Sequence, residues 1–432
     1  MSAIEHIPEF SRPIDNGLLR FLTCGSVDDG KSTLIGRLLY DTKAILADTL
    51  HAIEKTSLRR GLEAVDLSLL TDGLQAEREQ GITIDVAYRY FSTGRRKYII
   101  ADAPGHEQYT RNMVTAASTA DLAIILIDAR KGVLTQTRRH SCLAHLMGIP
   151  HLLVAVNKMD LVGYDQTVFE RICGEYLAFA RQLGIGDVRF VPLSALKGDM
   201  LVDRGDNLSW YPGPTLIEIL QSAPAAHSGC DERFRFPVQY VCRPRKADDP
   251  ALHDYRGFMG RVESGEIAVG DEVLVLPSER RSRIKGIHVG GNPQPRAIAE
   301  QSVTLLLEDE IDVSRGDMIV RAGDQESARV TRRIEAMLCW LGDRPLDAQR
   351  KYLIRQTTRE TRALLDGIGQ RLDINTLQEH PADGLAMNDI ARVAFKLAQP
   401  LVVDSYTENR ATGAFIVIDE STNNTVGAGM IL

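Results

Sequence analysis

One short stretch near the amino terminus constrains this chain more than any other part of it. From Gly25 to Thr33 it reads Gly-Ser-Val-Asp-Asp-Gly-Lys-Ser-Thr, which fits the phosphate-binding loop pattern of glycine, four residues, glycine, lysine, and serine or threonine. A mostly apolar run, 18–22, precedes the loop, and a helical pattern, 34–40, follows it. We therefore predict a strand, a loop and a helix that bind nucleotide phosphates. A glycine-rich structural turn is the alternative.

The chemistry of phosphate binding gives the positions of this loop their expected roles. Gly25 and Gly30 let backbone N–H groups turn inward toward phosphate oxygens, and the helix N-terminus adds the positive end of its dipole. Lys31 can reach the outer phosphates, and Ser32 can ligate Mg²⁺. The expected contact set is the whole loop: Gly25, Ser26, Val27, Asp28, Asp29, Gly30, Lys31, Ser32 and Thr33.

A second motif, Asp102-Ala103-Pro104-Gly105-His106, follows the apolar run 98–101. An aspartate at a strand end, in this order after a phosphate loop, suits a water-mediated contact to Mg²⁺. Gly105 can bring its N–H close to a terminal phosphate because no side chain intervenes. We therefore place Asp102 and Gly105 in the same predicted site.

Two further motifs predict recognition of guanine. Asn157-Lys158-Met159-Asp160 follows the apolar run 152–156. There Asp160 can accept from guanine N1–H and the exocyclic amine, while the stem of Lys158 covers the purine face. Ser194, Ala195 and Leu196 follow the run 188–192 and can contact the guanine oxygen through backbone N–H groups. Four motifs in this order, each after an apolar run, predict a GTP or GDP site.

A long charged span lies between the loop and Asp102, and it ends in Gly81-Ile82-Thr83-Ile84-Asp85. Thr83 can offer its hydroxyl to Mg²⁺ and its N–H to the γ-phosphate. Segments of this type order around a triphosphate and relax on hydrolysis. The alternative is a solvated helical hairpin with a strand threonine. The predicted metal set is Ser32, Thr83 and Asp102.

Composition and patterning predict the class and the domains. The chain has 432 residues, of which 44% are apolar and 25% are charged, and this composition is ordinary for a cytoplasmic globular protein. Its net charge of −7 gives no sign of a broad basic surface for binding nucleic acid or membrane. Apolar strands alternate with helical stretches to about residue 220, and short apolar runs with turn signals follow. We predict an α/β P-loop domain with a mainly parallel sheet over 1–222, a linker, and β barrels over 232–324 and 325–432.

The motif order resembles the translation-factor class of GTPases, of which elongation factor Tu is a familiar member and which carries two β barrels after the GTPase domain. Longer segments are similar to the GTPase subunit of bacterial two-subunit sulfate adenylyltransferase, namely 76–91, 105–113, 136–140, 373–376, 412–419 and 425–430. Ser26 and Asp29 stand where elongation factors carry histidine. Both departures fit the sulfate-activating branch better than the tRNA-delivering one.

The resemblance implies a function and further site residues. It implies that GTP hydrolysis drives ATP and sulfate to adenylylsulfate and pyrophosphate on a partner catalytic subunit, which binds the ATP and sulfate. His106 would orient the attacking water, Lys31 would neutralise charge, and Val27 and Ile82 would form an apolar gate for the histidine. The alternative is a translation-type GTPase that delivers an aminoacyl-tRNA. A stand-alone regulatory switch would leave the two barrels unexplained.

Overall fold

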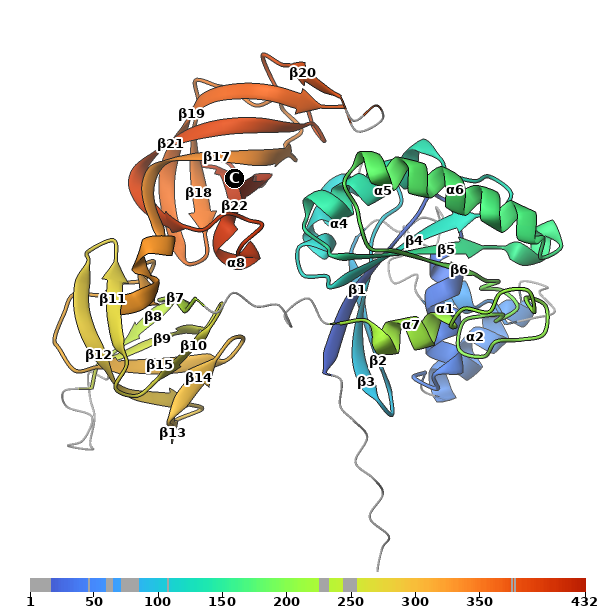
Figure 1. Ribbon diagram of the computed structural model, residues 1–432, viewed down its shortest axis with the longest axis horizontal. Coiled ribbons are helices and arrows are strands. Elements are labelled where there is room, and N and C mark those ends of the chain that lie inside the picture. The colour runs from blue at the N-terminus through green and yellow to red at the C-terminus, as the bar shows by residue number, and fades with distance from the viewer. Residues whose placement is uncertain are drawn as a thin grey trace, which may run out of the picture. The chain divides into compact units, whose positions relative to one another are not determined.

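The computed structural model describes residues 17–45, 47–59, 65–70, 85–106, 109–224, 233–243, 255–373, 376 and 378–432. The chain divides into two compact units, Met1–Ser228 and Gly229–Leu432, whose elements are labelled in Figure 1. The first unit combines helices and a sheet, and the second is built from strands in two barrels. The predicted α/β domain followed by two β barrels is confirmed.

The sheet of the first unit has the strand order β2-β3-β1-β4-β5-β6. Its strands are β1 (Leu18–Cys24), β2 (Ala87–Thr93), β3 (Arg96–Asp102), β4 (Leu122–Asp128), β5 (His151–Asn157) and β6 (Val188–Pro192). Only the β2–β3 pairing is antiparallel. Because β4 lies inside a parallel sheet with both faces covered, every one of its residues is buried, which explains its unbroken apolar run.

Helices alternate with the strands of this sheet, as the alternation of apolar patterns predicts. They are α1 (Lys31–Asp41), α2 (Ala47–Arg59), α4 (Thr110–Ala117), α5 (Thr135–Leu146), α6 (Gln166–Gln182) and α7 (Leu216–Ser222). Helix α6 begins where the Asp165 carboxylate accepts the Thr167 N–H, and α7 begins with a capping box between Thr215 and Glu218. Among the described residues, no helix is long and apolar enough to cross a membrane.

The first barrel of the second unit follows the strand order β7-β16-β11-β12-β15-β9-β8, with β13 paired to β12 and a separate β10–β14 pair. Its strands are β7 (Arg235–Pro237), β8 (Tyr240–Cys242), β9 (Gly257–Arg261), β10 (Glu266–Ala268), β11 (Glu272–Leu276), β12 (Arg280–Val289), β13 (Asn292–Gln294), β14 (Arg296–Ile298), β15 (Ser302–Leu307) and β16 (Met318–Arg321). β7 and β8 form the two ends of this path, and a buried apolar core packs inside it.

The second barrel follows the order β18-β22-β23-β17-β21-β19-β20, and an additional β18–β19 pairing closes it. Its strands are β17 (Arg329–Trp340), β18 (Lys351–Gln356), β19 (Arg359–Leu372), β20 (Glu379–Pro381), β21 (Ile390–Val403), β22 (Ala414–Asp419) and β23 (Thr425–Ile431), with a short helix α8 (Arg410–Gly413). A 3₁₀ segment, Ala322–Ser327, joins the barrels and contains Asp324, where the sequence predicts the boundary.

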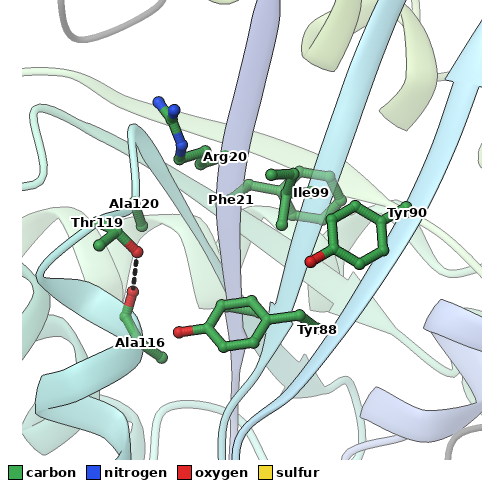
Figure 2. A pocket seen from close by; sticks show the side chains of 9 residues that line it. Arg20, Phe21, Tyr88, Tyr90, Ile99, Ala116, Thr119 and Ala120 are labelled. Atoms are coloured by element: carbon green, nitrogen blue, oxygen red, sulfur yellow. Dashed lines mark hydrogen bonds between the residues drawn. The ribbon is translucent and has the colours of Figure 1, made fainter. Parts of the chain in front are cut away.

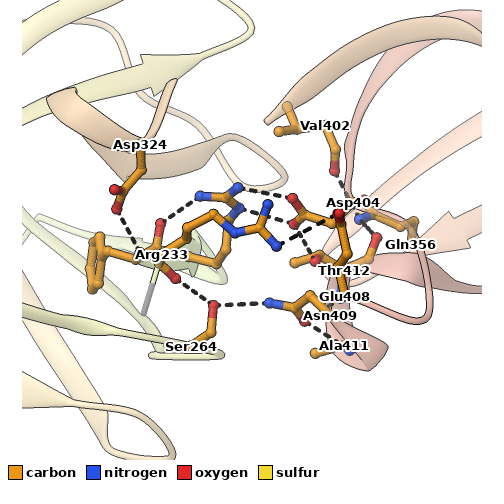
Figure 3. A network of polar contacts seen from close by, with 12 residues as sticks. Arg233, Ser264, Asp324, Gln356, Val402, Asp404, Glu408, Asn409, Ala411 and Thr412 are labelled. Carbon is orange, nitrogen blue, oxygen red and sulfur yellow. Dashed lines mark hydrogen bonds and ion pairs between the residues drawn. The ribbon is translucent and has the colours of Figure 1, made fainter. Parts of the chain in front are cut away.

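A buried polar network joins the two barrels (Figure 3). Arg235 of the first barrel donates Nε and one terminal N–H to the two carboxylate oxygens of Asp404 in the second, at 3.0 and 2.9 Å. Both side chains are almost fully buried, at 0% and 1% exposed. Thr412 also donates its hydroxyl to Asp404, and Asn409 donates to Ser264 across the junction. The buried charges are therefore paired and hydrogen-bonded, as burial requires.

An apolar cluster lies across the same junction. It consists of buried side chains on β11 and β16 together with two from the second barrel: Leu274, Leu276, Met318, Val320, Ala328 and Val402. The barrels thus share buried apolar surface as well as the ion pair, and together they form a single compact unit.

Candidate nucleotide-binding site

The loop after β1 is held by its own carboxylate. Asp29 Oδ2 accepts the Ser26 N–H at 2.6 Å, and the Asp29 N–H donates to the Ser26 carbonyl at 3.2 Å. Asp28 and Gly30 adopt left-handed φ angles of 67° and 94°. At Gly30 a Cβ would lie 2.5 Å from Asn157 Nδ2, so both the backbone angle and the close approach require glycine.

Helix α1 starts directly after this loop, and no side chain caps its N-terminus. First-turn N–H groups without a capping side chain, at the positive end of the helix dipole, suit the binding of an anion. Lys31 is buried, with Nζ 3.5 Å from the Gly25 carbonyl oxygen. Ser32 and Thr33 follow in the same turn and are half-buried.

Asp29 is a buried carboxylate with an altered affinity for protons. Its burial raises its pKa to about 6, against the opposing effects of the Ser26 N–H and the Lys31 charge. Within the described residues, Asp29 Oδ1 and the Ser26 hydroxyl oxygen are both buried without a hydrogen-bond partner. The loop thus carries polar groups that its own fold leaves unsatisfied.

The second motif lies against the phosphate loop. Asp102, at the end of β3, is 1% exposed, and its Oδ1 lies 3.4 Å from the Thr23 hydroxyl oxygen. A Cβ on Gly105 would lie 2.5 Å from the Gly25 carbonyl oxygen and 2.8 Å from Lys31 Nζ. Gly105 therefore lies against the loop where a side chain would collide, and its contact with a phosphate stays a prediction.

The residues predicted to act on water are partly described. His106 is exposed, and its ring lies edge-on to Tyr109 at 6.3 Å between centroids. Val27 is 37% exposed on the loop. Ile82 and Thr83 lie outside the described residues, so their predicted roles in the gate and in metal binding stay predictions.

The two base-recognition motifs meet each other and the phosphate loop. Asn157 donates Nδ2 to the Asp29 carbonyl at 2.8 Å and accepts the Ala195 N–H at 2.9 Å. Ser194 donates its hydroxyl to Asp160 Oδ1 at 2.7 Å, which orients that carboxylate. Because the Ala195 N–H is already used, the Leu196 N–H is the donor of this segment that remains for a base oxygen among the described contacts.

Lys158 links the 157–160 motif to the end of β4 and to the loop after β1. It adopts a left-handed φ of 63°, and its Nζ lies 3.2 Å from Asp128 Oδ2 and contacts the Asp28 carbonyl oxygen. Burial of Asp128 would raise its pKa, but hydrogen bonds from Arg130 and Lys158 outweigh burial and lower it to about 2. Asp128 was not among the predicted residues. Its position at the end of β4 is the signal that could have indicated it.

Gln136, on the first turn of α5, is a second residue that the site prediction missed. Its Nε2 donates to the Gly105 carbonyl oxygen at 2.9 Å and lies 3.2 Å from His140 Nε2. The sequence segment that contains both residues indicated a family resemblance but no contact with Gly105.

A separate pocket of about 260 Å³ opens on the sheet face beside α4. Figure 2 shows Tyr88 and Tyr90 of β2 facing it, with Arg20 and Thr119 on its other sides. No residue of the four nucleotide motifs lines it. The nucleotide motifs therefore form a site distinct from this pocket.

Comparison with known proteins identifies the relatives of this chain. The family model "Elongation factor Tu GTP binding domain" matches residues 16–225, "Elongation factor Tu domain 2" matches 258–320, and "GTP-eEF1A C-terminal domain-like" matches 333–432. "Sulfate adenylyltransferase subunit 1" of Cellvibrio japonicus (strain Ueda107) is 55% identical over 417 residues, which cover 96% of this chain and 86% of the relative.

A second relative carries the same name. The protein of the same name from Laribacter hongkongensis (strain HLHK9) is 55% identical over 416 residues, covering 96% of this chain and 85% of the relative. Among solved structures, sup35 complexed with GMPPNP matches 98% of this chain and 94% of that chain, with 22% identity and a TM-score of 0.43.

Proposed function

Because this chain belongs to the sulfate adenylyltransferase subunit 1 family, with an elongation factor Tu type GTP-binding domain, we propose that it is the GTPase of a sulfate-activating enzyme. In this proposal GTP hydrolysis drives ATP and sulfate to adenylylsulfate and pyrophosphate on a partner catalytic subunit. The observation that carries the proposal is the meeting of four separate motifs around one loop, with Gly30 against Asn157 and Gly105 against Lys31.

The placement of the two reactions follows from the nucleotide motifs. The chain has one such set, and its Asp160 carboxylate is suited to guanine and not to adenine. Formation of adenylylsulfate is energetically uphill because it makes a reactive phosphosulfate anhydride. We therefore assign adenylyl transfer to the partner subunit, and we assign the supply of free energy to this chain.

The residues of the loop have roles that follow from charge. Phosphoryl transfer to water depends on positioning and charge neutralisation more than on covalent chemistry. Lys31 and the N–H groups at the start of α1 neutralise charge that develops toward the leaving β-phosphate. His106 orients the attacking water, and Val27 flanks its approach together with Ile82.

The oxygen ligands at this site fit Mg²⁺. Ser32 offers a hydroxyl at the start of α1, and Asp102 offers a buried carboxylate at the end of β3, which are the hard donors that Mg²⁺ prefers. Thr83 is the third proposed ligand. When bound there, Mg²⁺ would supply positive charge that offsets the negative charge of the nucleotide phosphates.

The decisive experiment is sulfate-dependent pyrophosphate release by the chain together with its copurified companion subunit, with and without GTP. We expect GTP to raise the yield of adenylylsulfate, and Lys31→Ala to remove this effect while the subunits stay associated. Absence of a GTP effect, combined with tight binding of aminoacyl-tRNA, would favour a translation GTPase instead.

The proposed role of His106 has its own test. His106→Ala should slow single-turnover GTP hydrolysis by roughly 100-fold or more, the scale of a lost acid–base or positioning group, and leave GTP affinity near that of the wild type. Unchanged hydrolysis would show that His106 is only a turn residue.

A further inference from the structure

The amide of Gln136 has only one orientation that satisfies its two partners. A carbonyl oxygen such as that of Gly105 accepts hydrogen bonds and cannot donate them. The atom 2.9 Å from it must therefore be the amide nitrogen, which carries two hydrogens. The second hydrogen is directed to His140 Nε2 at 3.2 Å. His140 Nε2 then acts as the acceptor, and the ring proton lies on Nδ1.

His140 is suited to remain a neutral acceptor. It is 2% exposed, and its burial, together with the positive charges of Lys31 and Arg139, lowers its pKa to about 3. Within the described residues its buried Nδ1 has no hydrogen-bond partner, which is unfavourable for a buried polar atom. An apolar side chain at this position would avoid that penalty but would leave the second N–H of Gln136 without an acceptor.

The helix that carries this pair is held at both its start and its middle. Thr137, the residue after Gln136, accepts the Leu134 N–H through its hydroxyl at 3.2 Å. This hydrogen bond caps the start of α5. Ser141, one residue after His140, shares a 2.7 Å hydrogen bond with the hydroxyl of Tyr176 on α6. Gln136 thus projects from a well-anchored helix toward the second motif.

The bond from Gln136 acts on the backbone of His106. The Gly105 carbonyl belongs to the planar peptide unit that also contains the His106 nitrogen, so fixing its oxygen fixes the position of the His106 Cα. On the other side, the His106 carbonyl accepts the Tyr109 N–H at 3.0 Å. The main chain is held before and after His106, while its imidazole stays exposed.

We propose that Gln136 is the positioning residue for His106, and that His140 locks the Gln136 amide in the required orientation. This inference rests on the function proposed above. Without the Gln136 donor, the Gly105–His106 peptide can rotate. The His106 Cα then moves, and the imidazole is no longer held in one position relative to the attacking water. Nucleotide binding should change little. Among the described contacts, Gln136 bonds to no residue of the 25–33 loop or of the guanine motifs, and the Gly105 N–H that is predicted to meet the phosphate belongs to the preceding peptide unit, which the Gln136 bond does not hold.

The test compares Gln136→Met, which keeps side-chain length but removes the donor, with Thr135→Ala, an exposed neighbour on the same turn. Single-turnover hydrolysis and GTP affinity are measured on the complex with its companion subunit. We expect Gln136→Met to slow hydrolysis by about 10- to 100-fold, the scale of a lost alignment, while the Kd for GTP stays within about twofold. Thr135→Ala should match the wild type. A loss of GTP affinity that matches the loss of rate would overturn the inference.

A double-variant cycle separates positioning from general damage to the fold. If Gln136 acts only through His106, then Gln136→Met should cause no further slowing in a His106→Ala background. Full additivity of the two effects would overturn the inference but leave the proposed role of His106 intact. A single His106→Ala variant with normal hydrolysis would instead overturn that role, and this inference with it.

Discussion

The buried carboxylate of Asp29 should make the stability of the first unit fall as pH rises. Its pKa is raised to about 6 from a usual 3.8, so the folded state holds this proton more tightly than the unfolded chain does. Ionisation of Asp29 therefore lowers the free energy of unfolding. This loss of stability is absent below about pH 3.8, grows between pH 3.8 and 6, and is complete above pH 6. Asp29→Asn removes the titration, and the asparagine side-chain oxygen can still accept the Ser26 N–H.

The size of the effect follows from the shift. A difference of about 2 pKa units corresponds to about 3 kcal/mol of unfolding free energy at high pH, and roughly half of it has developed at pH 5. We therefore expect the stability of Asp29→Asn relative to the wild type to be greater at pH 8 than at pH 5 by about 1–2 kcal/mol. The pH dependence is the quantity to compare, because the new amide also adds buried N–H donors whose penalty does not change with pH.

Urea unfolding at pH 5 and pH 8 measures this difference. The chain has two tryptophans, and a Trp340→Phe background leaves Trp210 as a fluorescent reporter of the first unit. Asp28→Asn is the matched control, because it removes an exposed carboxylate from the same loop. If Asp29→Asn differs from the wild type by the same amount at both pH values, then the reasoning about the buried carboxylate is wrong.

Three further substitutions test other parts of the structure. Asp160→Asn should weaken GTP binding by about 2–4 kcal/mol and shift preference toward xanthine nucleotide, which competition binding would detect. Gly105→Ala places a methyl group 2.5 Å from a backbone oxygen and should lower GTP affinity by about 10-fold or more, whereas Gly94→Ala, in open space, should not. Arg235→Ala should destabilise the second unit by about 3–5 kcal/mol in chemical denaturation, and replacing Arg235 and Asp404 together with methionine and leucine should cost much less.

The parts of the site that could be predicted are those in which local chemistry demands particular residue types. The loop from Gly25 to Thr33 needs glycine at position 30, where a Cβ would lie 2.5 Å from Asn157 Nδ2, and the lysine that follows is the residue type that binding of phosphate predicts. The strands before each motif were predictable because they are buried apolar runs, although several extend one or two residues further. Asp102, for example, is polar but still pairs with Ala87 in the sheet.

The contacts that could not be predicted join residues far apart in the sequence that belong to no shared pattern. Gln136 and Gly105 are 31 positions apart, and Arg235 and Asp404 are 169 positions apart. A glutamine on a helix and an arginine on a strand are both most often solvated, so only the fold reveals that these two have specific partners. Asp128 was predictable in part, because the sequence shows its position at the end of an apolar run but not its ion pair with Lys158.

The junction between the barrels also determines how the chain could be divided. A cut between β16 and β17, where separate family models end and begin, would bare the shared apolar cluster on two fragments. One fragment would also carry Arg235 and the other Asp404, so that each would expose the charged partner that the other fragment needs. The second unit therefore offers a site for split-protein complementation, in which the two barrels are produced separately and reassemble only in the register that this ion pair dictates.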